Sequence, residues 1–217
     1  EIVKYAYDSG EKVATIATSK GIFSEAKTRF DDYQFSADES KILIKTDEES
    51  IYRRSTKANY YVYLIEKKRS FPLADQSKGK QRLATFSPSG DMVAYVRDNN
   101  IFMMDINYRE EVKITFDGEK NKIINGATDW VYEEEFGFDN GFYWSPKGDR
   151  IAYYKFNETK VKEFQMAMYG DLYPEQYTFK YPKAGEVNSV VSILIYDINA
   201  MVSKLVDTGK ETDIYIP

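Results

Sequence analysis

Short hydrophobic segments separated by turns recur along most of the chain, which is the pattern of β-strands joined by hairpins. Residues 12–18 (KVATIAT) form the first clear segment, and three related units follow at 33–44, 84–95 and 142–153. Each unit passes from an aromatic residue through a serine and a following Pro or Ala into an apolar segment. Pro fixes φ at such a turn, and Gly supplies the positive φ that a tight hairpin needs. The units therefore predict hairpins that recur along the chain.

Further apolar segments follow the three units at 60–65, 101–106 and 193–198. The repeat is thus roughly 50 residues long with about four short strands, which is typical of a β-propeller blade. An antiparallel sandwich with unrelated serine turns is the alternative, but three copies in register favour the propeller. Because three blades cannot close into a ring, we predict an all-β fold that is an open arc of a larger propeller. The predicted blades lie at 1–30 (partial), 31–80, 81–120 and 121–210, followed by the start of the next blade.

Composition narrows the chemistry that this chain can perform. It has 35 acidic and 30 basic residues, a net charge of −5, and the signs are interspersed, whereas a nucleic-acid surface needs a clustered basic face. It has no cysteine, which excludes disulfides and thiolate metal sites, and no histidine, so a Ser-His-Asp triad cannot be assembled from it. No apolar run approaches the ~20 residues that span a bilayer, so we predict no transmembrane segment. No leader opens the chain, and we expect it to be cut from something longer.

Residues 125–136 (NGATDWVYEEEF) depart from the strand pattern and predict a short helix with three consecutive glutamates, Glu133 to Glu135. Asp129 is suited to cap the N-terminus of this helix. Adjacent helical residues are about 100° apart, so two of the three carboxylates can converge on one point while the third turns away. A solvated charge run on the surface is the alternative. The residues that can anchor the helix in the core are Trp130, Val131 and Tyr132.

Converging carboxylates repel each other unless a cation lies between them. A protein ammonium, a metal ion or the amine of a ligand could supply that charge. Hard metals generally need more oxygen ligands from several segments, so we predict no metal site. Two unit charges about 4 Å apart attract by ~1 kcal/mol in water and by ~4 kcal/mol at an effective dielectric near 20. The residues therefore favour an amine ligand if the site is recessed.

Arg53 and Arg54, in the segment Tyr52-Arg53-Arg54-Ser55, are expected on a strand, where neighbouring side chains point to opposite faces. Only one of the two can then face a site. A guanidinium beside the glutamates could hold a carboxylate and still donate to a carbonyl. An exposed surface pair is the alternative.

These motifs together resemble one known family. The segments NGATDWVYEEE (125–135), WSPKGDRIAYYKFNET (144–159) and YPKAG (181–185) are similar to the propeller domain of the dipeptidyl peptidase IV family. The resemblance implies an eight-bladed propeller joined to a C-terminal α/β-hydrolase domain. It also implies the activity of this family, which removes dipeptides from free peptide N-termini and prefers Pro or Ala in second position. A binding module without catalysis remains the alternative, because a propeller fold alone does not decide function.

The same resemblance implies roles for single residues. Glu134 and Glu135 would bind the terminal ammonium of the substrate, and Glu133 would be structural. Arg53 would contact the glutamates and the first peptide carbonyl of the substrate. The catalytic Ser, Asp and His would belong to the hydrolase domain, so we expect no catalytic residue here and no activity of this chain alone. Residues 136–138 (Phe-Gly-Phe) are less polar than the usual continuation of the motif, which leaves the shape of the neighbouring pocket open.

Partners and location are also implied by the resemblance. The expected partners are peptides with a free N-terminus, the protein's own hydrolase domain and, at full length, a second copy. No cofactor is expected, and the expected location is periplasmic or secreted in a bacterium. Family members dimerise partly through an arm of the fourth blade, for which the candidate is a short segment near 193–208. The segment 157–191 is longer than the connection that a regular blade needs at this place, which predicts an insertion.

Overall fold

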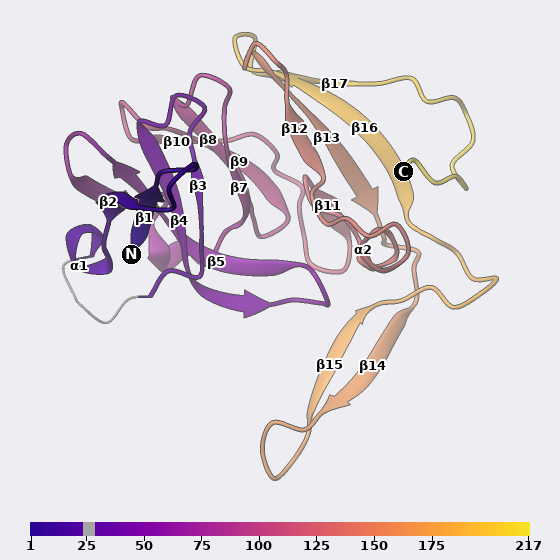
Figure 1. Ribbon diagram of the computed structural model, residues 1–217. Coiled ribbons are helices and arrows are strands. Elements are labelled where there is room, and N and C mark those ends of the chain that lie inside the picture. Colours follow the sequence, from indigo (N-terminus) through magenta and orange to yellow (C-terminus); the bar gives the residue numbers. More distant parts are fainter. Residues whose placement is uncertain (24–28) are drawn as a thin grey trace.

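The strands form antiparallel sheets that follow one another in chain order (Figure 1). The computed structural model describes residues 1–23 and 29–217, so part of the predicted first blade, 24–28, lies outside the described residues. The N-terminal pair is β1 (Ile2–Tyr5) with β2 (Lys12–Ala17), followed by α1 (Ser19–Ile22). The next sheet, β3–β6, contains β3 (Asp32–Phe35), β4 (Lys41–Ser50), β5 (Thr56–Leu64) and β6 (Arg69–Pro72). After a 3-10 helix (Gln76–Lys78), the β7–β10 sheet contains β7 (Arg82–Phe86), β8 (Met92–Arg97), β9 (Asn100–Asp105) and β10 (Glu110–Lys113).

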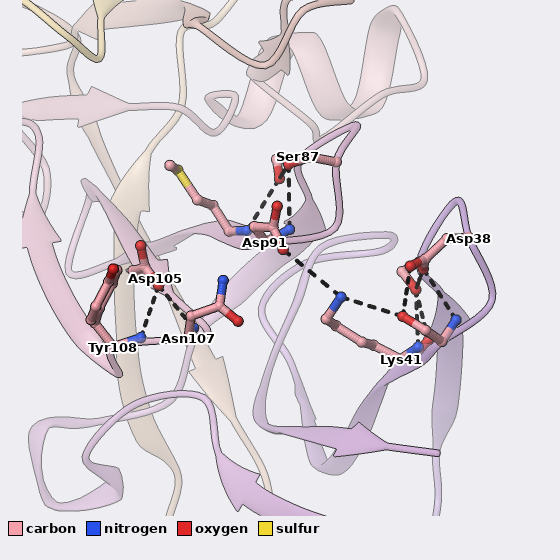
Figure 2. Close-up of polar contacts among 11 residues, drawn as sticks. Asp38, Lys41, Ser87, Asp91, Asp105, Asn107 and Tyr108 are labelled. Atoms are coloured by element: carbon pink, nitrogen blue, oxygen red, sulfur yellow. Dashed lines mark hydrogen bonds and ion pairs between the residues drawn. The ribbon is translucent and has the colours of Figure 1, made fainter. Parts of the chain in front are cut away.

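The repeated serine turns have a local physical cause. The hydroxyl oxygen of Ser87 accepts a hydrogen bond from the backbone N–H of Met92 at 3.1 Å, which closes the turn before β8 (Figure 2). The hydroxyls of Ser36 and Ser145 accept in the same way from Lys41 at 3.0 Å and Arg150 at 3.1 Å. Each unit therefore starts its second strand with the same side-chain cap, which explains why the motif is legible in the sequence.

The β7–β10 sheet is buried on both faces. In β8, Val93 and Tyr95 pack in a cluster with residues of the β3–β6 sheet, whereas Ala94 and Val96 pack in a second cluster with the sheet that follows. Successive strand residues point to opposite faces, so this alternation stacks one sheet between two others. Such stacking of antiparallel sheets without closure confirms the predicted all-β fold, an open arc of a propeller.

The last sheet has a divided edge. Its central strand β13 (Arg150–Asn157) pairs on one side with β16 (Val190–Asp197), and β17 (Val202–Leu205) pairs with β16. On the other side β13 pairs with both β12 (Phe142–Trp144) and β11 (Ile123–Asn125). The chain leaves this edge between β11 and β12 to form α2 (Trp130–Glu135). The acidic helix therefore lies in the connection between two short strands, β11 and β12, that share one edge of the sheet.

An arm projects from this last sheet, away from the stack (Figure 1). It is the hairpin of β14 (Glu163–Met168) and β15 (Glu175–Lys180), and it occupies the predicted insertion at 157–191. The expectation of an arm near 193–208 is wrong, because β16 and β17 in that range are strands of the sheet itself and β16 pairs with β13 over its whole length. In the described residues no helix is long and apolar enough to cross a membrane.

Candidate functional site

Buried polar contacts fix the start of α2. Asp129 occupies the N-cap position with extended backbone, and its Oδ1 accepts from the N–H of Tyr132 at 3.0 Å, so the predicted cap is present. Its Oδ2 accepts from the hydroxyl of Ser189 at 2.7 Å, which ties the helix to the residue before β16. Burial raises the pKa of Asp129, whereas these hydrogen bonds act in the opposite direction. The helix therefore begins at a defined place relative to the last sheet.

Aromatic residues hold the body of the helix. Tyr132 is 1% exposed, and its ring lies 4.8 Å from that of Phe156 in β13. Its hydroxyl accepts from the N–H of Ile216 at 2.6 Å, so the C-terminal segment also contacts α2. Trp130 is half-buried and lies 4.4 Å from the ring of Tyr181. These contacts leave α2 little freedom to rotate about its axis.

Glu133 points into the protein and contacts another sheet. Its side chain is fully buried, and its Oε1 accepts from the N–H of Arg54 at 2.7 Å and of Ser55 at 2.8 Å. These amides belong to the loop between β4 and β5. Arg53 and Arg54 therefore lie in a loop and not on a strand as expected, because β4 ends at Ser50 and β5 starts at Thr56.

Glu134 is the glutamate that meets an arginine. Its Oε2 lies 2.9 Å from Nε of Arg53; the Glu134 side chain is 16% exposed and that of Arg53 is 74% exposed. The pair lines a cleft together with the base of the arm, including Phe164 and Met166 of β14. The structure thus brings Arg53 and Glu134 together at the surface, with the carboxylate recessed and the guanidinium open to solvent.

Glu135 is exposed and lines an adjoining cleft beside Phe136 and Tyr215. The two clefts share one wall, formed by Trp130, Tyr181, Lys183 and Ala184. Of the three carboxylates, Glu133 is turned inward, and Glu134 and Glu135 line adjoining hollows that share these four residues. Helical geometry produces this arrangement, because each residue is rotated by about 100° from the one before it. In residues 1–23 and 29–217 no group of three or more His, Cys, Asp or Glu side chains is placed to hold a metal ion.

A family model describes what this chain is similar to. The model of the "Dipeptidyl peptidase IV (DPP IV) N-terminal region" matches residues 36–217. The chain belongs to the dipeptidyl peptidase IV family. It is 38% identical over 177 residues to a probable dipeptidyl-aminopeptidase B of Podospora anserina, covering 75% of this chain and 19% of that protein. It is 34% identical over 198 residues to the prolyl endopeptidase FAP of Homo sapiens, covering 90% of this chain and 25% of that protein.

A solved structure extends the likeness to three dimensions. The crystal structure of Porphyromonas gingivalis dipeptidyl peptidase 4 superposes with a TM-score of 0.92 at 44% identity. The match covers 99% of this chain and 30% of that one. The chain therefore spans between about a fifth and a third of the length of these relatives.

Sequence reasoning missed two polar residues of this dipeptidyl peptidase IV region. Arg82 of β7 is half-buried, and desolvation lowers its pKa while the charges of Asp139 and Glu133 oppose that change. The side chain of Glu158 is 5% exposed, and burial, followed by the charge of Asp129, raises its pKa to about 7. No local pattern marks Arg82 or Glu158, because their neighbours come from other sheets.

Proposed function

We propose that this chain is the substrate-recognition propeller of a serine dipeptidyl peptidase that releases N-terminal X-Pro and X-Ala dipeptides. It binds the free ammonium of the peptide through Glu134 and Glu135, and Arg53 lies beside Glu134. The observation that carries the proposal is the Arg53–Glu134 pair at 2.9 Å, which lines a cleft and is held on a helix fixed by buried residues.

The charges suit an amine and a carbonyl in neighbouring positions. The carboxylate of Glu134 is largely withdrawn from water, so its attraction for an ammonium exceeds the ~1 kcal/mol of bulk water and approaches the ~4 kcal/mol of a dielectric near 20. Arg53 contacts Glu134 through Nε, and its terminal nitrogens extend into solvent, where they can donate to a peptide carbonyl. Together the groups hold one end of the substrate at a fixed position.

This role is positioning and not bond-making. Holding the N-terminus at a set distance from a nucleophile makes cleavage fall after residue two, and its value is entropic and orientational. The chain has no histidine, so the proposed catalytic Ser, Asp and His come from a C-terminal α/β-hydrolase domain of the same protein. On this proposal the chain alone is inactive and needs no cofactor.

Substrates with and without a free amine test the proposal in the full-length protein. Ala-Pro-p-nitroanilide should be cleaved, and its N-acetylated form should be cleaved at least 100-fold more slowly, which corresponds to roughly 2.7 kcal/mol. Glu134→Gln should lower kcat/KM for the free substrate by a similar factor, whereas Glu110→Gln on an exposed strand should not. Equal cleavage of the acetylated and free substrates would show that the glutamates do not recognise the ammonium.

The arm supports a second proposal, that two full-length copies associate through it. Its tip exposes large apolar side chains, with Tyr169 79%, Leu172 89% and Tyr173 81% exposed. Exposed apolar groups of this size gathered on one projecting hairpin are typical of protein contact sites. The relative from Porphyromonas gingivalis is bacterial. We further propose a periplasmic or secreted location, which the family resemblance implies and which cell fractionation would test.

A further inference from the structure

The loop that carries Arg53 has few contacts of its own. It links β4 and β5 between Ser50 and Thr56, and one backbone hydrogen bond, from the N–H of Ile51 to the carbonyl of Ser55 at 2.8 Å, closes it. The pairing of β4 with β5 is irregular just before the loop, between Thr46 and Glu49. The exposed side chain of Arg53 cannot hold the backbone in place. Contacts from outside the loop must therefore fix its conformation: the ring of Tyr52, before Arg53, lies 5.8 Å from that of Phe179 in β15, and the residues after Arg53 need a contact of their own.

Glu133 supplies that contact from a residue 79 positions away in the chain. One oxygen of its carboxylate accepts both amides that follow Arg53, those of Arg54 at 2.7 Å and Ser55 at 2.8 Å. Buried hydrogen bonds of this kind are costly to break, because the amides would be left without a partner. Two of them at consecutive amides fix the direction of the backbone as it leaves Arg53.

Neighbouring residues of α2 therefore hold Arg53 from two sides. Glu134 contacts its guanidinium, and Glu133 holds the backbone that carries it. Because both glutamates belong to the same short helix, the distance between the loop and the carboxylate of Glu134 is fixed by helical geometry. Glu133 itself cannot reach a ligand, since its side chain is fully buried and the amides occupy Oε1.

The buried charge of Glu133 has a compensating cation nearby. Its Oε2 and the Nε of Arg82 are both buried and without a hydrogen-bond partner among the described residues. The two groups interact electrostatically without forming an ion pair within 4 Å. A buried carboxylate requires such compensation, because an isolated charge in a low dielectric is strongly unfavourable. Arg82 thus offsets the carboxylate of Glu133 together with that of Asp139, and the two amides orient the Glu133 side chain.

We propose that Glu133 is a positioning residue that fixes Arg53 beside Glu134 through the amides of Arg54 and Ser55. The inference rests on the proposed function, since it assigns Glu133 a role in the same recognition of the peptide N-terminus. This role depends on the length of the side chain and not on its charge, because binding requires an acceptor oxygen that extends to the two amides.

Two conservative substitutions in the full-length protein separate the effect of side-chain length from that of charge. Glu133→Gln removes the charge but keeps an acceptor oxygen at the same distance, so KM for Ala-Pro-p-nitroanilide should stay within about threefold. Glu133→Asp keeps the charge but is one methylene shorter, so KM should rise about tenfold or more, with a smaller change in kcat. Thermal unfolding of both variants checks that they are folded. The opposite order, with Gln impaired and Asp normal, would overturn the proposal.

A double-mutant cycle tests whether Glu133 acts through Arg53. Glu133→Asp should raise KM by less than twofold when Arg53 is already Ala, because the residue it positions is gone. Full additivity of the two substitutions would overturn the positioning role while leaving the proposed function intact. If Arg53→Ala and Glu134→Gln alone leave kcat/KM unchanged, the proposed function itself fails, so the two failures are distinguishable.

Discussion

Glu158, a buried carboxyl close to the N-cap of α2, makes the stability of the protein depend on pH. It follows β13 directly, its side chain is 5% exposed, and the groups that influence its charge are Asp129, the N-cap of α2, and Lys180 of β15. Burial first, and then the negative charge of Asp129, raises the pKa of Glu158 from an ordinary 4.5 to about 7. Glu158→Gln removes the ionisable group and keeps its shape.

The direction of the pH effect follows from the raised pKa. The folded protein favours the neutral acid, so the contribution of Glu158 to stability is fully present below pH 4.5 and is lost as pH rises through about 7. At 1.36 kcal/mol per pH unit, the interval between 4.5 and 7 corresponds to about 3 kcal/mol. Solvent screening reduces this figure little, because the side chain is almost completely buried.

The assay compares unfolding of the full-length wild type and the Glu158→Gln variant between pH 5 and pH 8. The variant should be the more stable protein at pH 8, and its advantage should shrink by roughly 2 to 3 kcal/mol at pH 5, where the wild-type carboxyl is protonated. Glu110→Gln, on an exposed strand, should follow the wild type at both pH values. Parallel pH profiles of wild type and Glu158→Gln would refute a buried carboxyl that titrates near neutrality.

Two further predictions concern the loop before α2 and the arm. Gly126 has φ +76°, and an added Cβ would lie 2.6 Å from Cγ1 of Ile101, so Gly126→Ala should lower the free energy of unfolding by about 2 kcal/mol. The control is Gly170→Ala, which should melt as the wild type does because no atom lies within 4 Å of its added Cβ. Equal melting temperatures of the two variants would contradict the strain expected at Gly126. Leu172→Asp at the arm tip should convert a full-length dimer into monomers, measured by sedimentation velocity, and should leave the melting temperature unchanged. Leu205→Asp, at an exposed residue of β17, should leave the dimer intact. A dimer that survives Leu172→Asp would argue against an interface at the arm.

The features that could be predicted from the sequence are those with local causes. The serine of each repeat unit caps a backbone amide five residues later, so the unit and its hairpin are visible in a single short segment. Asp129 caps Tyr132 three residues on, and the short helix could be predicted for the same reason. The apolar segment that forms β8 is also local, although the sequence does not show that its two faces contact different sheets.

The features that could not be predicted depend on contacts between distant segments. Arg53 was expected on a strand because its neighbours are strand-like, and no local signal shows that β4 ends at Ser50. The amide partners of Glu133 lie 78 and 79 residues before it, and nothing in the run of three glutamates tells the first from the others. The arm was misplaced because the strands of a hairpin that leaves the sheet have the same composition as strands within it.

The two contacts around Arg53 differ in what they contribute. An ion pair whose arginine is 74% exposed adds at most about 1 kcal/mol to stability, because water screens it and long side chains lose entropy on pairing. The bonds from Glu133 to the loop amides are buried, so water does not compete for them and they contribute more to ordering the loop than the exposed pair does. A weak exposed pair suits binding, since Glu134 can exchange part of its contact with Arg53 for a ligand amine at little loss. On the proposed function, the α2 helix therefore divides two tasks between adjacent residues: the buried Glu133 stabilises the loop, and the recessed Glu134 beside it recognises the ligand.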